Sequence, residues 1–373
     1  DLKITNPNHA QYIISFIFFG MAMGEIISGP LSDAWGRKEI LFIGIGLFLV
    51  GSITCYCAAT LPVMLAGRML QGIGVAGPYI ASVSIVRDKF SGRDMARVMS
   101  LVMMVFMAVP AVAPTVGQGI MLYTSWRYIF LMYIVYSVLV GLWILFRLEE
   151  TLPVERRIPF SWHNLVRGFK EVVTNRITMG YTMVMCFVFG GFMGYLNSCQ
   201  QIFQGLFNTG KMFTLYFSML AIVLAVSSFV NSAIVKRLGM QRICFIALSG
   251  LIVASMIFLI LQLFVSITLW MFMLYAVAVF FAFGLVMGNI NAMAMEPMGH
   301  IAGIASAIIS SLTSLIPMVI GSIIGQLYNN TLFPITIGFV VFGICGLVTL
   351  IHAGRGMAAP LEDPVEEDPT EAA

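Results

Sequence analysis

The stretch Gly29-Pro-Leu-Ser-Asp-Ala-Trp-Gly-Arg-Lys38 decides the fold, together with the apolar run from Pro62 to Val86 that follows it. Arg68 stands inside this run, too far from its end to reach the membrane surface easily. A guanidinium in hydrocarbon costs about 3 kcal/mol on insertion scales unless it faces protein or water. A basic loop followed by an intramembrane arginine indicates a membrane protein with a function inside the bilayer.

The composition excludes a soluble protein. Of the 373 residues, 60% are hydrophobic and 10% are charged, whereas a soluble chain carries about 25% charged residues. Continuous apolar runs also exclude an outer-membrane barrel. A helix crosses the bilayer with about 20 apolar residues, so the predicted fold class is an all-α polytopic membrane bundle of eleven spans. The spans are Gln11–Ser28, Ile40–Ala59, Pro62–Val86, Val98–Leu122, Arg127–Phe146, Ile177–Phe207, Phe213–Val235, Ile243–Val265, Leu269–Ala294, Ile301–Leu327 and Leu332–His352.

Positive charge is concentrated in alternate loops. All but four of the 20 Lys and Arg residues lie on one side of this topology, and the exceptions are Lys3, Arg68, Arg127 and Lys211. By the positive-inside rule the basic side is cytoplasmic. We therefore expect residue 1 outside and the C-terminus inside. The six cysteines all lie in apolar spans without ligand-type spacing, which argues against disulfides and metal binding.

An internal repeat divides the chain. The loop around Gly239 echoes the loop around Gly36, and parallel repeats are typical of transporters built from two similar halves. The expected divisions are a first half at 1–146, a cytoplasmic linker at 147–176 with a surface helix, a second half at 177–353 and a disordered acidic tail at 354–373. Two spans precede the loop in the second half but only one does in the first, so we expect the full fold to have twelve helices and this chain to lack the first.

The first loop carries a pattern of small and charged residues: Gly29, Leu31, Asp33, Gly36, Arg37 and Lys38. This pattern resembles the signature of the major facilitator superfamily between its second and third helices. Gly29 lets a helix approach its neighbour closely, and Gly36 permits a tight turn. Asp33 can accept hydrogen bonds from an arginine. Ala34 departs from the family, which commonly has a basic residue there.

Two ionisable residues are candidates for proton coupling. Arg68-Met-Leu-Gln-Gly-Ile-Gly74 resembles the fourth-helix motif of the superfamily, whose arginine is associated with coupling. The alternative is a structural arginine bonded to carbonyls, and we favour the functional role because of its depth. Glu25 is the only carboxylate well inside a span. It is either a protonatable site or a structural partner of loop cations or a facing helix.

Two further motifs point to export. Pro110 and Pro114 lie four residues apart, weaken one face of a helix, and with Gly117 resemble the fifth-helix motif of antiporters. The alternative is a merely kinked structural helix. Glu296 and Pro297 precede a small-residue helix that includes Gly303, and this resembles the Bcr/CflA group of drug-resistance exporters. That group more often has glutamine where this chain has Glu25. The resemblance implies proton-driven antiport of amphipathic drugs from the bacterial inner membrane.

Polar residues within spans are candidates for the substrate cavity, although interhelical hydrogen bonding is the commoner use. These are Gln71, Asn197, Gln200, Gln201, Asn289 and Asn291. Because the sequence has no nucleophile–base pair or nucleotide motif, we expect no enzyme and no cofactor, with energy from a proton gradient. We expect a monomer in the lipid bilayer that binds small molecules and protons but no nucleic acid. A metabolite exporter or symporter, or a non-transporting truncated remnant, are the alternatives.

Overall fold

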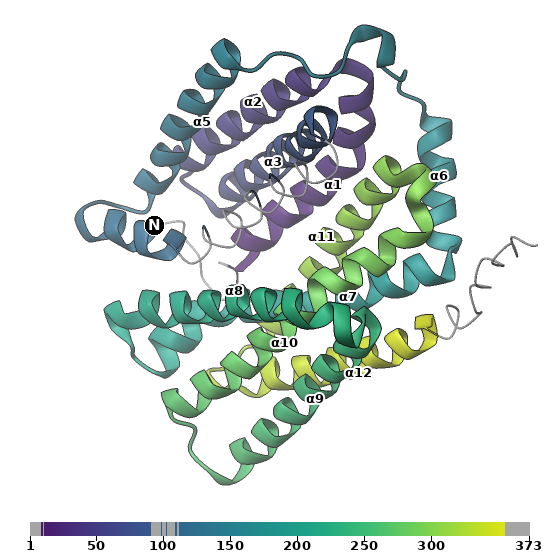
Figure 1. Ribbon diagram of the computed structural model, residues 1–373. Helices are drawn as coiled ribbons and strands as arrows, with labels where there is room; N and C mark the ends of the chain where they lie inside the picture. Colours follow the sequence, from purple (N-terminus) through teal and green to yellow (C-terminus); the bar gives the residue numbers. More distant parts are fainter. Residues whose placement is uncertain are drawn as a thin grey trace, which may run out of the picture.

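The computed structural model describes residues 9, 11–90, 98, 102, 109 and 112–354, and this part of the chain is helical without strands (Figure 1). Residues 112–123 form a helix that follows undescribed residues. The other principal helices are α1 (Tyr12–Trp35), α2 (Arg37–Tyr56), α3 (Leu61–Lys89), α5 (Arg127–Arg147), α6 (Trp162–Thr174), α7 (Arg176–Gln200), α8 (Phe213–Leu238), α9 (Met240–Phe264), α10 (Leu269–Met295), α11 (Ala302–Gln326) and α12 (Phe333–Gly354).

The described residues include nine apolar helical stretches long enough to cross a membrane, and the longest, Leu269–Gln326, contains both α10 and α11. Ten of the eleven predicted spans therefore appear as separate helices. The remaining span, Val98–Leu122, is described mainly from residue 112 onward. The prediction of an all-α polytopic membrane bundle is confirmed. The predicted acidic tail lies outside the described residues apart from Gly354, which ends α12.

The stretch quoted first is mostly helix, so its prediction as a loop is wrong. α1 continues through Pro30 to Trp35, and only Gly36 separates it from α2. Gly36 has a φ of 115°, a conformation that glycine adopts without a steric penalty. Gly239 has a φ of 77° between α8 and α9. The two glycines therefore hold equivalent turns of the internal repeat.

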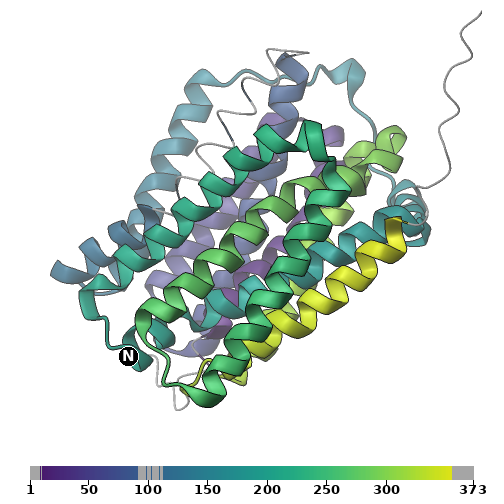
Figure 2. The ribbon, with the colours of Figure 1, turned by 60° about the horizontal axis from the view of Figure 1, so that its bottom comes forward.

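The neighbours of the helices also repeat. In the first group α3 packs against α1 and α2, and α2 packs against α5; in the second, α10 packs against α8 and α9, and α9 packs against α12. The second group lies in front of the first in Figure 2. The second group also contains α7, which packs against α10, α11 and α12. α1 and α11 form the main contact between the groups, and they run side by side where the groups meet (Figure 1).

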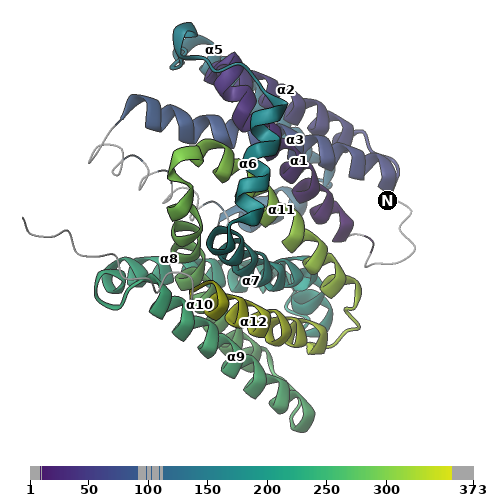
Figure 3. The same ribbon diagram turned by 90° about the vertical axis from the view of Figure 1, so that its right-hand side faces the viewer.

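The linker between the groups forms the helix α6, where the sequence predicts a surface helix. The Ser161 side chain caps its start by accepting from the backbone N–H of Asn164, and such caps satisfy donors that the first turn leaves free. α6 packs against α11 and α7. Figure 3 shows it near one end of α11, facing the viewer. The linker thus lies close to the contact between the two groups.

Candidate functional site

Polar side chains cross the contact between α1 and α11, which we call the seam. The Oγ atoms of Ser15 and Ser322 lie 2.6 Å apart. Further along, Ser311 Oγ donates to the carbonyl oxygen of Ala22 at 2.8 Å. Hydroxyl groups of this kind hold membrane helices together while keeping the interface narrow. The seam therefore has a hydrogen-bonded surface instead of a purely apolar one.

Glu25 lies in the middle of this seam and is 1% exposed. Its Oε2 atom accepts a hydrogen bond from Ser314 Oγ of α11 at 2.9 Å. Among the ion pairs of the described residues none includes Glu25. The facing-helix alternative is therefore the one seen here. A buried intramembrane carboxylate without a cation is unfavourable when it is ionised.

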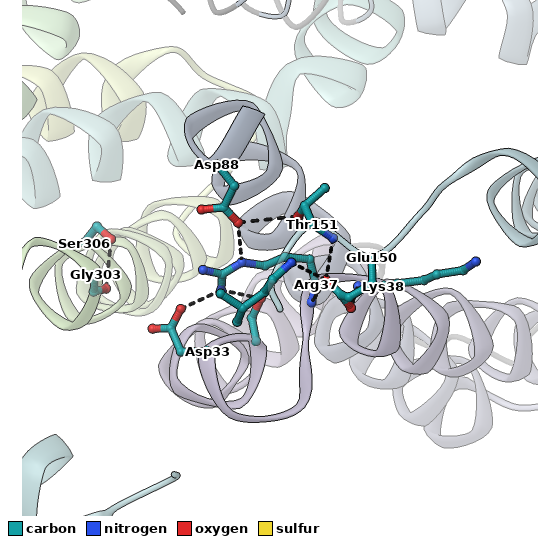
Figure 4. Close-up of polar contacts among 10 residues, drawn as sticks. Asp33, Arg37, Lys38, Asp88, Glu150, Thr151, Gly303 and Ser306 are labelled. Atoms are coloured by element: carbon teal, nitrogen blue, oxygen red, sulfur yellow. Dashed lines mark hydrogen bonds and ion pairs between the residues drawn. The ribbon is translucent and has the colours of Figure 1, made fainter. Parts of the chain in front are cut away.

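The first motif reaches the seam through its small and acidic residues. A Cβ atom built on Gly29 would lie 3.3 Å from the Cβ of Ala307 on α11. Asp33 faces Gly303, because a Cβ on that glycine would lie 3.9 Å from Asp33 Oδ2; Figure 4 shows both residues at this end of α11. The structure thus brings together the first sequence motif and the start of the small-residue helix.

Arg37 is the centre of an ion-pair cluster at the same end (Figure 4). The residue is 4% exposed. Its guanidinium donates to Asp33 Oδ1 at 2.5 Å, Asp88 Oδ2 at 3.0 Å and Ser32 Oγ at 3.0 Å. These bonds join α1, α2 and α3, so they stabilise the first group internally. Asp88 was not among the predicted site residues; its place between two cations in the sequence was the available signal.

Glu150 extends this cluster into the linker. Its carboxylate accepts hydrogen bonds from the backbone N–H groups of Arg37 and Lys38, each at 3.1 Å, and from those of Thr151 and Leu152. Burial raises the pKa of Glu150, but the four N–H donors together lower it by more than burial raises it. The pKa of Glu150 therefore lies below its ordinary value. Lys38 Nζ donates to a carbonyl oxygen at the end of α5.

Arg68 has the partners expected of a structural arginine. Its Nε donates to the carbonyl oxygen of Ile13 at 3.0 Å, and its Nη1 donates to Gln71 Oε1 at 3.1 Å. Gln71 is fully buried and donates to Ser52 Oγ at 2.8 Å, so it lies in a network and not in a cavity. The guanidinium also lies 5.8 Å from the ring centre of Phe130.

The two predicted coupling residues do not form one site. Arg68 binds α1 at Ile13, whereas Glu25 lies twelve residues further along the same helix, which corresponds to about 18 Å at the α-helical rise. None of the ion pairs among described residues includes Arg68. The two residues both involve α1 but have different partners: Arg68 binds Ile13 of α1, and Glu25 of α1 binds Ser314 of α11.

The helix 112–123, which carries the described part of the predicted antiporter motif, lines a groove against the second group. Pro114, Gly117 and Gln200 border a cavity of about 620 Å³, together with Gln118 and Thr214. Thr214 Oγ1 donates to Gln118 Oε1 and so joins the two groups. Pro110 lies outside the described residues. This groove brings together two sets of residues that the sequence analysis treated separately.

The other polar candidates are dispersed. Gln201, in the π-helical turn Gln201–Leu206, accepts a hydrogen bond from Gln11 Nε2 at 3.2 Å. Asn289 donates to Asn231 Oδ1 at 2.7 Å, which joins α10 to α8. Asn291 is exposed. Asn197 is buried next to Gly325 of α11, and its Oδ1 has no hydrogen-bond partner in the described part of the chain.

Aromatic side chains form a wall between the groups that the sequence did not single out. The rings of Phe192 and Phe283 stack at 4.5 Å between centres, and Phe189 lies against both. Phe18 of α1 contacts Phe189 edge-on at 6.3 Å. These rings are partly exposed and offer a surface on which flat apolar molecules can pack.

Glu296 and Pro297 begin the 3₁₀ turn Glu296–Ile301, which joins α10 to α11. His300 in this turn lies with its Nε2 2.5 Å from Glu171 Oε1 of α6. The turn that the Glu-Pro pair begins therefore contacts the linker helix through His300. The described residues contain no group of three or more His, Cys, Asp or Glu side chains placed to bind a metal ion.

The apolar spans, the repeated turns and the polar seam define a multi-pass membrane transporter. The family model of the Major Facilitator Superfamily matches residues 3–322, and the chain belongs to this family. YdgK of Bacillus subtilis, described as an uncharacterized MFS-type transporter, is 30% identical over 89% of this chain and 82% of its own. A bicyclomycin resistance protein homolog of Haemophilus influenzae is 27% identical over 94% of this chain and 87% of its own.

Other similar proteins agree with this family. The multidrug resistance protein MdtL of Salmonella typhimurium is 28% identical over 98% of this chain and 92% of its own. Two solved structures share the fold. The xylose transporter XylE of E. coli has a TM-score of 0.71 and 12% identity over 95% of this chain and 89% of its own. The human organic anion transporter MFSD10 has a TM-score of 0.67 and 17% identity over 93% of this chain and 83% of its own. These relatives are transporters and not enzymes, and this family needs no cofactor.

Proposed function

We propose that the chain exports amphipathic small molecules across the bacterial inner membrane in exchange for protons, with the C-terminus in the cytoplasm. The observation that carries this proposal is Glu25, a buried carboxylate whose Ser314 bond joins the two groups of helices. Protonation changes what this side chain can accept and donate, and it removes a charge from the seam. Proton binding is thereby linked to the contact that must rearrange during alternating access.

The substrate class is inferred from the relatives and the aromatic wall. Relatives are named for bicyclomycin and multidrug resistance, and the rings around Phe192 suit apolar compounds of varied shape. We take residues 1–146 and 177–353 as the two moving halves, joined by the linker at 147–176. Bicyclomycin and a lipophilic cationic dye are the first compounds to test.

Glu25→Gln tests the coupling step. The purified protein in proteoliposomes should drive dye transport when a pH gradient is imposed, and an uncoupler should abolish that transport. The amide keeps the size and hydrogen bonding of Glu25 but cannot exchange the proton. We expect gradient-driven transport to fall by roughly 100-fold, as for loss of a general acid–base group, while dye binding persists.

Glu39→Gln is the matched control, because Glu39 is an exposed carboxylate on α2. It should leave transport unchanged. Gradient-driven transport by Glu25→Gln at the wild-type rate would rule out the proposed role of Glu25. Uncoupler-insensitive transport by the unmodified protein would instead rule out proton exchange altogether.

A further inference from the structure

α6 carries an apolar stripe that stays largely open in the described part of the chain, where only the Phe160 ring packs edge-on against Trp162. Trp162, Val166, Phe169 and Val173 are 63%, 61%, 46% and 38% exposed. Their spacing places all four within a sector of about 60° on one face, at roughly 100° per residue. A compact stripe with two aromatic rings on a surface helix marks a contact site.

The packed face of α6 fixes the direction in which this stripe points. Val172 is fully buried, and Gly168 packs so closely that a Cβ there would lie 2.6 Å from the Ile304 side chain of α11. The His300–Glu171 pair holds the other flank. α6 therefore has two distinct apolar faces: one packs on α11, and the stripe beside it remains open.

Basic residues border the open stripe. His163, Arg167 and Lys170 are exposed, and helical spacing puts them on the flank away from the buried face. Glu171 lies on the side of α6 opposite the stripe, at about 180° by the same spacing, where it pairs with His300. An apolar stripe bordered by cations is complementary to a membrane surface that presents acyl chains below anionic headgroups.

We propose that α6 binds the anionic phospholipid surface of the leaflet next to the linker. Trp162 and Phe169 enter the boundary between headgroups and acyl chains, where aromatic rings are favoured. Arg167 and Lys170 bind the phosphate groups. Because α6 is clamped to α11 and lies beside the seam, this contact would hold the linker helix against the membrane while the halves move.

Hydrogen exchange in nanodiscs tests this proposal with the whole chain. Peptides covering 162–174 are compared in discs of phosphatidylcholine alone and of phosphatidylcholine mixed with phosphatidylglycerol. Each interfacial cation contributes roughly a fivefold preference for an anionic surface, so exchange should slow severalfold in the mixed discs. The double variant Arg167→Gln/Lys170→Gln should lose this difference. Lys236→Gln/Arg237→Gln, which removes two exposed cations at the end of α8, should keep it.

Quenching by brominated phosphatidylcholine provides a second measurement. The emission difference between wild type and Trp162→Phe isolates Trp162, and the proposal requires that this difference be quenched. Unquenched Trp162 emission, or exchange that does not respond to phosphatidylglycerol, would overturn it. Protection that rises only with the number of protein molecules per disc would assign the stripe to a second copy and also overturn it.

Discussion

Glu25 and Arg68 are both ionisable residues within spans, but their surroundings differ. Glu25 has one hydroxyl partner across the seam, whereas Arg68 binds a carbonyl and an amide within the first group of helices. Hydrogen bonds to charged groups contribute about 1.5–3 kcal/mol each. Arg68 therefore both stabilises the first group and holds α1 against α3, and a test of its role must separate these effects.

Arg68→Ala should lower the thermal stability and also abolish gradient-driven transport. Arg127→Ala is the matched control, because Arg127 also donates to a backbone carbonyl, that of Ala58 at 3.1 Å, but at the end of a span. We expect the control to lose stability and keep transport. Arg68→Lys should rescue only partly, since the ammonium lacks the planar fork. Full transport by Arg68→Ala in proteoliposomes would refute a coupling role.

The pKa of Glu150 predicts a pH-dependent stability. Because its pKa is lowered in the folded protein, Glu150 stabilises the fold above its unfolded value of about 4.3. This stabilisation is lost as the pH falls through the lower folded value. As the pH falls, the melting temperature of the detergent-solubilised protein should therefore decrease less in Glu150→Gln than in wild type. Glu149→Gln, an exposed neighbour, should behave like wild type; an identical response in both variants would contradict the assignment.

At the scale of helices, glycines serve two different contacts of α1. Gly20 packs against α3 so closely that a Cβ would lie 2.1 Å from the carbonyl oxygen of Met69, whereas at Gly29 the nearest atom, on Ala307 of α11, is 3.3 Å away. The first contact belongs to one group of helices and the second crosses the seam. The helices are thus packed more tightly at Gly20, within the first group, than at Gly29, between the two groups.

Alanine at each glycine should separate the two contacts. Overpacking of a well-packed core typically costs roughly 1–3 kcal/mol. Gly20→Ala should destabilise the fold by at least this amount, which would be seen as a lower melting temperature. Gly29→Ala needs a shift of only a few tenths of an ångström, so its melting temperature should stay near that of wild type while transport slows severalfold. Equal losses of stability in both variants would show that the seam is as rigid as the α1–α3 contact.

Much of the arrangement of helices follows from the sequence, because bilayer thickness fixes how long an apolar run must be. Glycines within the basic stretches predicted the turns at Gly36 and Gly239, although the residues before Gly36 are helix and not loop. It could not find which buried side chains meet, since that depends on the rotation of each helix against partners far away in the chain. Glu25 and Ser314 are separated by 289 positions, and no local pattern marks Ser314 as the partner. Asp88 does lie between two cations in the sequence, but that pattern does not identify Arg37 of another helix as its partner.

Over the whole molecule, the charge pattern predicts sidedness that labelling can check. Asn329 and Arg156 are both exposed, so a cysteine at either position reports only which side of the membrane it faces. Native Cys57 is exposed as well, and the test therefore uses a Cys57→Ser background. With an impermeant maleimide on intact cells, Asn329→Cys should react and Arg156→Cys should not.

Lysis supplies the control for this last experiment, since both cysteines should then react at similar rates. The physical reason is the strong bias of Lys and Arg toward the loops that include Arg156, which favours retention of those loops in the cytoplasm. Restoring Cys57 should add a signal from intact cells, because Cys57 ends α2 on the same side as Asn329 in this topology. Labelling of Arg156→Cys but not Asn329→Cys in intact cells would reverse the orientation, and with it the direction of transport proposed here.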